Sequence, residues 1–185
     1  TANVLKKQHD TPSIGYTTYT QLTNILIDCS TNTVDRFATN VFDLSEGHIY
    51  DGNGFTITVD NSGSYWQSSL FKAKEYTAAE QAYTRNGNTV KNLTIAGNAK
   101  VKSTDYQNFF GSPLMRGLDD HNGNKGINVT LQNIVITRTS SFSSGRGTYN
   151  RAPGLIGDSF PGQHGYLVID TCLVKLTGSE PFIGG

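Results

Sequence analysis

A short pattern that recurs along the chain constrains its fold more than any other feature. Four stretches, 22–27, 90–95, 131–136 and 169–174, read apolar, any residue, Asn or Thr, apolar, any residue, apolar, and 49–57 ends in the same way. Intervals of 30, 38, 41 and 38 residues separate the closing apolar residues, which are Ile27, Ile57, Ile95, Ile136 and Val174. Such self-similarity is typical of stacked repeats, where one repeat buries its apolar face only against the next.

The residues inside the repeat predict strands. In 55–59, Phe, Ile and Val alternate with two Thr, which is the pattern of a half-buried β-strand. Gly52 and Gly54 allow a tight corner just before it. A second motif, two apolar residues and then often Gly, recurs at 41–43, 70–72, 109–111, 155–157 and 182–184. We therefore expect an all-β solenoid, a parallel β-helix of about five coils whose closing apolar residues align.

The same repeat position holds Asn24, Asn92 and Asn133. Side-chain amides at a corner can hydrogen-bond from one repeat to the next and satisfy backbone groups there. The spacing therefore predicts an amide ladder. Asn92-Leu93-Thr94 and Asn128-Val129-Thr130 match the glycosylation sequon, but both lie in predicted strands, so we interpret both matches as chance.

One corner supports a family resemblance. The stretch Ile49-Tyr50-Asp51-Gly52-Asn53-Gly54-Phe55-Thr56-Ile57 resembles the Ile-x-Asp-Gly-x-Gly-x-x-Ile corner of right-handed β-helix proteins of the pectin-lyase-like group. The resemblance covers roughly residues 22–184 and implies a right-handed parallel β-helix with loop excursions. That group contains polysaccharide lyases, hydrolases, epimerases, phage and virus tail modules and adhesins. The resemblance thus implies a polysaccharide partner and an extracellular, cell-surface or virion location.

Charge and hydropathy narrow the partners. Lys plus Arg and Asp plus Glu number 15 each, so no bulk field attracts the chain to nucleic acid or to an anionic membrane. No apolar run approaches the ~20 residues that span a bilayer. We expect neither a nucleic-acid nor a membrane partner.

A single domain, 1–185, fits this length. We expect residues 1–19 to form an N-terminal cap or arm and residues 20–185 to form the coils, with excursions at 72–87, 112–126 and 140–151. The first of these has helix-forming composition. Because no capping sequence follows 182–184, we expect a piece of a larger protein, with self-association or the remaining chain at the last coil.

The excursions hold the candidate chemistry, since loops on a rigid scaffold carry function. Within 112–126, the candidate catalytic residues are Arg116, Asp119, Asp120 and His121. For a uronic-acid polymer, an arginine would neutralise the substrate carboxylate while a histidine removes the adjacent proton. For hydrolysis, an aspartate would pair with another carboxylate. The candidate substrate-binding residues are Lys72, Tyr76, Tyr83, Trp66, Arg146, Tyr149 and Arg151.

Metal and thiol chemistry are secondary. No cofactor is expected; Asp119-Asp120-His121 can hold Ca²⁺, although this ligand set is incomplete. Cys29 and Cys172 fall four coils apart, about 19 Å at the strand spacing, which exceeds the ~7 Å limit for a disulfide. We expect both to be buried free thiols.

Two functions remain open. The first is an enzyme, a lyase or glycoside hydrolase acting on cell-wall or acidic polysaccharide. The second is a non-catalytic glycan-binding or structural module, such as an adhesin, spike or virion segment. The resemblance favours the first, and the lack of clustered carboxylates on the predicted strands favours the second.

Overall fold

The computed structural model describes residues 5–9, 17–28, 42–60, 65–66, 70–80, 85–97, 100–102, 114–115, 124–139, 142–143 and 164–177. Strands make up most of these residues, and the helical structure among them is a single 3₁₀ turn, η1 (Ala78–Glu80). The chain is therefore all-β, as the alternation of apolar and polar residues predicts. In the part that the structure describes, no helix is long and apolar enough to cross a membrane.

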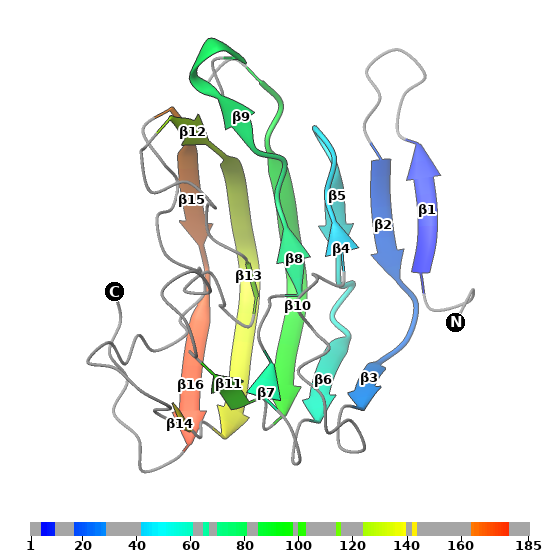
Figure 1. Ribbon diagram of the computed structural model, residues 1–185. Helices are drawn as coiled ribbons and strands as arrows, with labels where there is room; N and C mark the ends of the chain where they lie inside the picture. The colour runs from blue at the N-terminus through cyan, green and yellow to red at the C-terminus, as the bar shows by residue number, and fades with distance from the viewer. Residues whose placement is uncertain are drawn as a thin grey trace.

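Parallel strands form one large sheet (Figure 1). The long strands β10 and β13 extend along the whole sheet, and shorter strands pair with each half of their length. In one half the strand order is β2, β5, β10, β13, β15, and in the other half it is β3, β6, β10, β13, β16. The bounds are β2 (Thr17–Gln21), β3 (Ile25–Asp28), β5 (Ile49–Asp51), β6 (Thr56–Asp60), β10 (Asn88–Gly97), β13 (Asn128–Thr139), β15 (Tyr166–Asp170) and β16 (Leu173–Thr177). Within the predicted cap, β1 (Leu5–His9) pairs antiparallel with β2 and covers its edge.

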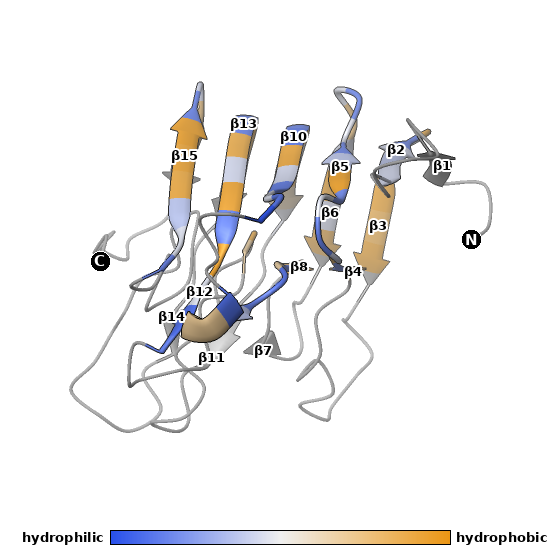
Figure 2. Cartoon of the chain, turned by 90° about the horizontal axis from the view of Figure 1, so that it is seen from above, coloured by the Kyte–Doolittle hydropathy of each residue, from blue (hydrophilic) through white to orange (hydrophobic). Residues whose placement is uncertain are grey.

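Short strands lie opposite this sheet (Figure 2). Two parallel groups occur, β4 (Phe42–Asp43) with β8 (Phe71–Lys72), and β7 (Tyr65–Trp66) with β11 (Lys100–Lys102) and β14 (Phe142–Ser143). An antiparallel pair joins β9 (Tyr76–Thr77) to β12 (Lys125–Gly126). The ends of the predicted repeats, including 109–111, 155–157 and 178–185, lie outside the described residues.

The register of the large sheet confirms most of the predicted alignment. Ile57 faces Ile95, Ile95 faces Ile136, and Ile136 faces Val174. The prediction is wrong for the first repeat, where Ile25 faces Ile57 and Ile27 faces Val59. Side chains in a strand alternate with period two, so a two-residue shift keeps the same residues inward, and the pattern alone cannot choose between the two registers.

The first two copies of the second motif pair with each other, since Phe42 faces Phe71 in β4–β8. On its other side, Phe71 forms a bridge with Met115, which lies beyond the third copy of the motif at 109–111. The Phe71 amide donates to the Leu114 carbonyl at 2.8 Å, and both Leu114 and Met115 are fully buried. These two apolar residues therefore pair with β8 and belong to the buried core, so their predicted place in the 112–126 excursion is wrong.

Residues with left-handed backbone recur at one corner of the large sheet, from the β5–β6 repeat to the β15–β16 repeat. Asn53, Asn92, Asn133 and Thr171 have φ of 53°, 53°, 51° and 53°. The Asn133 amide donates to Asn92 Oδ1 at 3.1 Å, and the Asn92 amide donates to Asp51 Oδ1 at 3.0 Å. The ladder of side-chain amides is thus confirmed for Asn92 and Asn133. Asn24 also hydrogen-bonds to the next repeat, as predicted, but to a backbone group: its Oδ1 accepts the Thr56 amide at 2.9 Å.

Thr171 is the exception at this corner, because a β-branched residue is strained at positive φ. Replacing it with Asn should raise the free energy of unfolding by about 1 kcal/mol, since Asn tolerates this backbone and can donate to Asn133 Oδ1. The test is a urea denaturation series, with Thr171→Val as the β-branched control. A Thr171→Asn variant no more stable than Thr171→Val would contradict the prediction.

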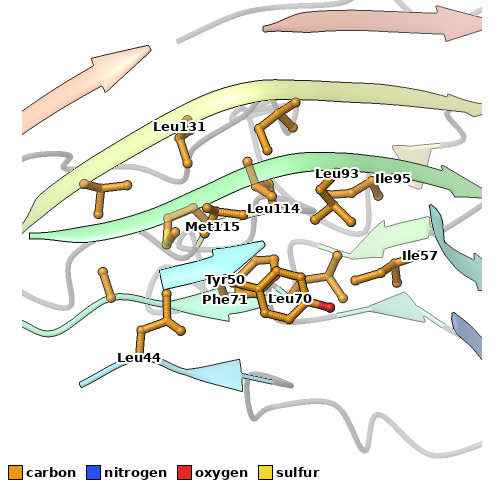
Figure 3. Close-up of a cluster of buried hydrophobic side chains, with 14 of the residues drawn as sticks. Leu44, Tyr50, Ile57, Leu70, Phe71, Leu93, Ile95, Leu114, Met115 and Leu131 are labelled. Carbon is orange, nitrogen blue, oxygen red and sulfur yellow. The ribbon is translucent and has the colours of Figure 1, made fainter. Parts of the chain in front are cut away.

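The apolar core lies between the large sheet and the short strands (Figure 3). Phe71 stacks on Phe42 with centroids 5.2 Å apart and meets Tyr50 edge-on at 4.7 Å. Tyr50 is fully buried, and its hydroxyl donates to Gln21 Oε1 at 3.0 Å, so two buried polar groups satisfy each other. Burial raises the pKa of Tyr50 well above its usual value.

Two further sequence predictions concern buried polar residues and thiols. Asn128 is 1 % exposed, its amide donates to the Arg85 carbonyl at 3.1 Å, and its Oδ1 accepts the Tyr166 amide at 3.2 Å. An oligosaccharide cannot be added to this side chain in the folded protein.

Cys172 carries a free, half-buried thiol 3.4 Å from the Asp170 carbonyl, and burial raises the pKa of this thiol. Cys29 lies outside the described residues.

Candidate functional site

A cavity of about 430 Å³ lies beside the segment that leads from β8 to β9 and beside the β9–β12 pair. Strands β4, β8, β9 and β12 and the turn η1 supply its walls. Its ionisable lining residues are Asp43, Lys72, Lys74, Glu75, Glu80 and Lys125, with Tyr76 also in the wall. Leu44, Ala73 and Thr77 complete the lining.

Local hydrogen bonds between Thr77 and Glu80 stabilise the η1 turn, which forms one wall of the cavity. Glu80 Oε2 accepts the Thr77 backbone amide at 2.7 Å and the Thr77 hydroxyl at 2.8 Å, which is half of a capping box around a short turn. These hydrogen bonds lower the pKa of Glu80 and keep it ionised. The helix-forming composition of 72–87 thus yields one 3₁₀ turn among the described residues, because Tyr76 and Thr77 pair with β12 instead.

Each lysine of the cavity has a carboxylate or an aromatic ring near it. Lys125 Nζ lies 2.9 Å from Glu75 Oε2, with side chains 36 % and 15 % exposed. Lys74 Nζ lies 5.7 Å from the Tyr76 ring centroid, and its charge also lowers the pKa of Glu80. Lys72 faces Asp43 in the register of β8 and β4. The described lining of the cavity therefore contains both positive and negative groups, close to one another.

Tyr76 reaches the cavity wall but offers little surface to a ligand, since it is 2 % exposed. Its hydroxyl donates to the Asn86 carbonyl at 3.3 Å. Burial, and secondarily the charge of Glu46, raises the pKa of Tyr76 to about 12. At neutral pH this hydroxyl keeps its proton, so it cannot act as a base, and its covered ring does not provide a sugar-stacking face.

The shifted pKa of Tyr76 makes stability depend on alkaline pH. Tyrosines of the unfolded chain lose their protons near pH ~10, whereas folded Tyr76 keeps its proton to about 12. The unfolded state then binds fewer protons than the folded state, and the free energy of unfolding should fall as the pH rises above about 10. Denaturant midpoints on either side of that pH should differ less in Tyr76→Phe than in the parent chain. An unchanged slope would contradict this assignment.

The structure brings together some of the predicted site residues. Lys72 and Tyr76 line the cavity, whereas Trp66 lies on β7, which Figure 1 shows at the other end of the structure from β9 and β12. The remaining candidates lie outside the described residues: Tyr83, Arg116, Asp119, Asp120, His121, Arg146, Tyr149 and Arg151.

Two described residues, Met115 and Asn124, flank in sequence the predicted catalytic residues, which lie outside the described residues. Met115 pairs with Phe71, the neighbour of Lys72 on β8. At the other end, the Asn124 carbonyl accepts the Ala78 amide of η1 at 2.8 Å, and Lys125 lines the cavity. Met115 and Asn124 therefore pair with β8 and η1, two of the elements that supply the cavity walls.

Sequence reasoning missed three carboxylates of the cavity, Asp43, Glu75 and Glu80. The Thr77-x-x-Glu80 spacing is a readable capping signal, but Asp43 reaches the cavity only through the pairing of β4 with β8. No group of three or more His, Cys, Asp or Glu side chains suited to a metal occurs among the described residues. Calcium binding by Asp119, Asp120 and His121 stays a prediction.

Comparison of the chain with protein-family models, with curated proteins and with solved structures gave no match. Evidence for function therefore comes from the cavity and from the repeat.

Proposed function

We propose that this chain is a right-handed parallel β-helix of about five coils that binds polysaccharide in the cavity between β8, β9 and β12. Support for the coil comes from four successive strands with aligned apolar residues, Ile57, Ile95, Ile136 and Val174. Further support comes from the recurring left-handed corner and from parallel pairing in the opposite short strands. Right-handed crossovers are the rule for parallel strands.

The observation that carries the binding proposal is the cavity itself. Its volume of about 430 Å³ falls within the range of ligand sites, ~300–1,000 Å³. Ammonium groups, carboxylates and a threonine hydroxyl line it, so it offers both donors and acceptors to sugar hydroxyls. A module of this kind suits a secreted, cell-surface or virion protein.

The described lining favours binding over proton transfer. Glu80 accepts two hydrogen bonds from Thr77, and Glu75 is paired with Lys125. The hydrogen bonds from Thr77 lower the pKa of Glu80 and stabilise its carboxylate rather than the protonated acid that hydrolysis of a glycosidic bond requires. Tyr76, with its pKa raised to about 12, is a poor base at neutral pH. A non-catalytic glycan-binding module is therefore the function that this geometry supports best.

A second candidate function, a polysaccharide lyase or glycoside hydrolase, is favoured by Met115 and Asn124, which flank the predicted catalytic residues in sequence and pair with β8 and η1. In that case Arg116 and His121 would serve elimination, or Asp119 and Asp120 would serve hydrolysis. Reducing ends and unsaturated uronide products, followed together on cell-wall polysaccharides, separate the two reactions. Product formation that survives replacement of all four residues by Ala would remove this assignment.

Binding is tested by titrating cell-wall polysaccharides against the parent chain and Lys72→Gln. Loss of this ammonium group from the cavity should weaken binding about tenfold, equivalent to ~1.4 kcal/mol. Lys175→Gln, at an exposed position of β16 outside the cavity, is the matched control and should bind as the parent does. Equal binding by the parent, Lys72→Gln and Lys175→Gln would place the glycan elsewhere.

A further inference from the structure

We infer that the cavity selects a neutral, hydroxyl-rich glycan over a uronate polymer. This inference rests on the proposed glycan-binding function and specifies its ligand. The observation behind it is the charge balance of the described lining residues, where three carboxylates offset three lysines: Asp43, Lys72, Lys74, Glu75, Glu80 and Lys125.

The Lys125–Glu75 pair makes the strongest contribution. With 2.9 Å between Nζ and Oε2, and with Glu75 only 15 % exposed, Glu75 already neutralises Lys125. A substrate carboxylate that approached Lys125 would have to displace Glu75 or lie beside it. Like charges placed next to each other in a partly buried site repel strongly, so this position disfavours an anion.

Each of the other two lysines also has a carboxylate of the lining in its neighbourhood. Lys74 lies over the Tyr76 ring and close enough to Glu80 to lower its pKa, and Lys72 faces Asp43 across β8 and β4. Clefts that attract charged polymers are lined by charge of one sign, which concentrates the field. This cavity has no such excess among its described lining residues.

A neutral sugar meets no such penalty. Each hydroxyl donates one hydrogen bond and accepts others, so it can donate to a carboxylate and accept from an ammonium group without displacing the existing pairs. Charge-assisted hydrogen bonds of this kind are stronger than neutral ones. A lining with balanced positive and negative charge therefore matches a polyol better than it matches a uronate.

The test compares two ligands that share one backbone, fully methyl-esterified oligogalacturonide and the free-acid form of the same length. Isothermal titration calorimetry with the full chain should give at least about tenfold tighter binding of the neutral ester. Binding of the ester should also change little with salt, because no net charge is neutralised. Tighter binding of the free acid would overturn the inference and leave glycan binding intact. If neither binds, nor any neutral cell-wall glycan, the proposed function fails with it.

Charge variants give a second, independent readout. Asp43→Asn keeps the Lys125–Glu75 pair and should strengthen free-acid binding while weakening binding of the ester. Glu75→Gln should do the same more strongly. Asp170→Asn, an exposed carboxylate of β15 outside the cavity, is the matched charge control. If Asp43→Asn shifts the preference no more than Asp170→Asn does, the lining does not set the specificity and the inference is wrong.

Discussion

Replacing Phe71 with Ala should lower the free energy of unfolding by about 3–5 kcal/mol, the usual cost of deleting a buried aromatic side chain. Phe71 has no exposed surface and contacts the rings of Phe42 and Tyr50. Its backbone also connects β8 to β4 and to Met115. A cavity at this point would be bordered by the large sheet and the short strands alike, and neither side can relax alone to fill it.

The loss is large compared with the ~5–15 kcal/mol that stabilises a typical domain. Denaturant unfolding, followed by the fluorescence of the single tryptophan and by circular dichroism, measures it. Leu26→Ala is the control, because Leu26 is 67 % exposed and its truncation should change stability by no more than about 0.5 kcal/mol. Similar losses in both variants would mean that the core lies elsewhere.

Gly97→Ala should destabilise the chain by about 3 kcal/mol or more, for two reasons that add. Its φ of +113° is unfavourable for any residue with a Cβ. A Cβ at this position would also meet the backbone of Val59 on β6, 2.8 Å from its carbonyl carbon and 2.9 Å from its nitrogen, and would contact its oxygen. Backbone cannot rotate away as a side chain can, so the β6–β10 pairing would have to open.

Gly54→Ala separates these two reasons. Gly54 also has a positive φ, +78°, but a methyl group added to it would meet nothing within 4 Å. This substitution should therefore cost only the conformational strain, about 1 kcal/mol. Thermal and urea denaturation of the two variants side by side give the difference. Equal destabilisation would show that Val59 does not approach Gly97 closely.

Local sequence predicts the site less well than the fold. Lys72 and Tyr76 follow a repeat motif, which places them at the edge of a groove, and both line the cavity. The mixed charge of that cavity could not be predicted from any motif in the local sequence. Asp43 comes from β4, about thirty residues before Lys72, and only the pairing of β4 with β8 brings the two together.

The amide ladder shows the same limit. Equal spacing identifies Asn92 and Asn133 as rungs, because they occupy equivalent places in equally long corners. The corner between Asp51 and Thr56 holds four residues, whereas the matching corner of β10, between Lys91 and Thr94, holds two. Asp51 is therefore the side chain that meets Asn92, and Asn24 accepts a backbone amide. Corner length changes which side chain reaches the stack, and the repeat pattern does not encode it.

By itself the sequence determined the all-β class, the inward face of the repeated strands and the order of the aligned apolar residues from Ile57 to Val174, because these follow from local alternation and period. Tertiary structure decided the register of the first repeat, the place of Leu114 and Met115 in the buried core, and the mixed charge of the cavity. Those features depend on which strands lie side by side, and hydrogen bonds between distant segments, not local preferences, fix that choice.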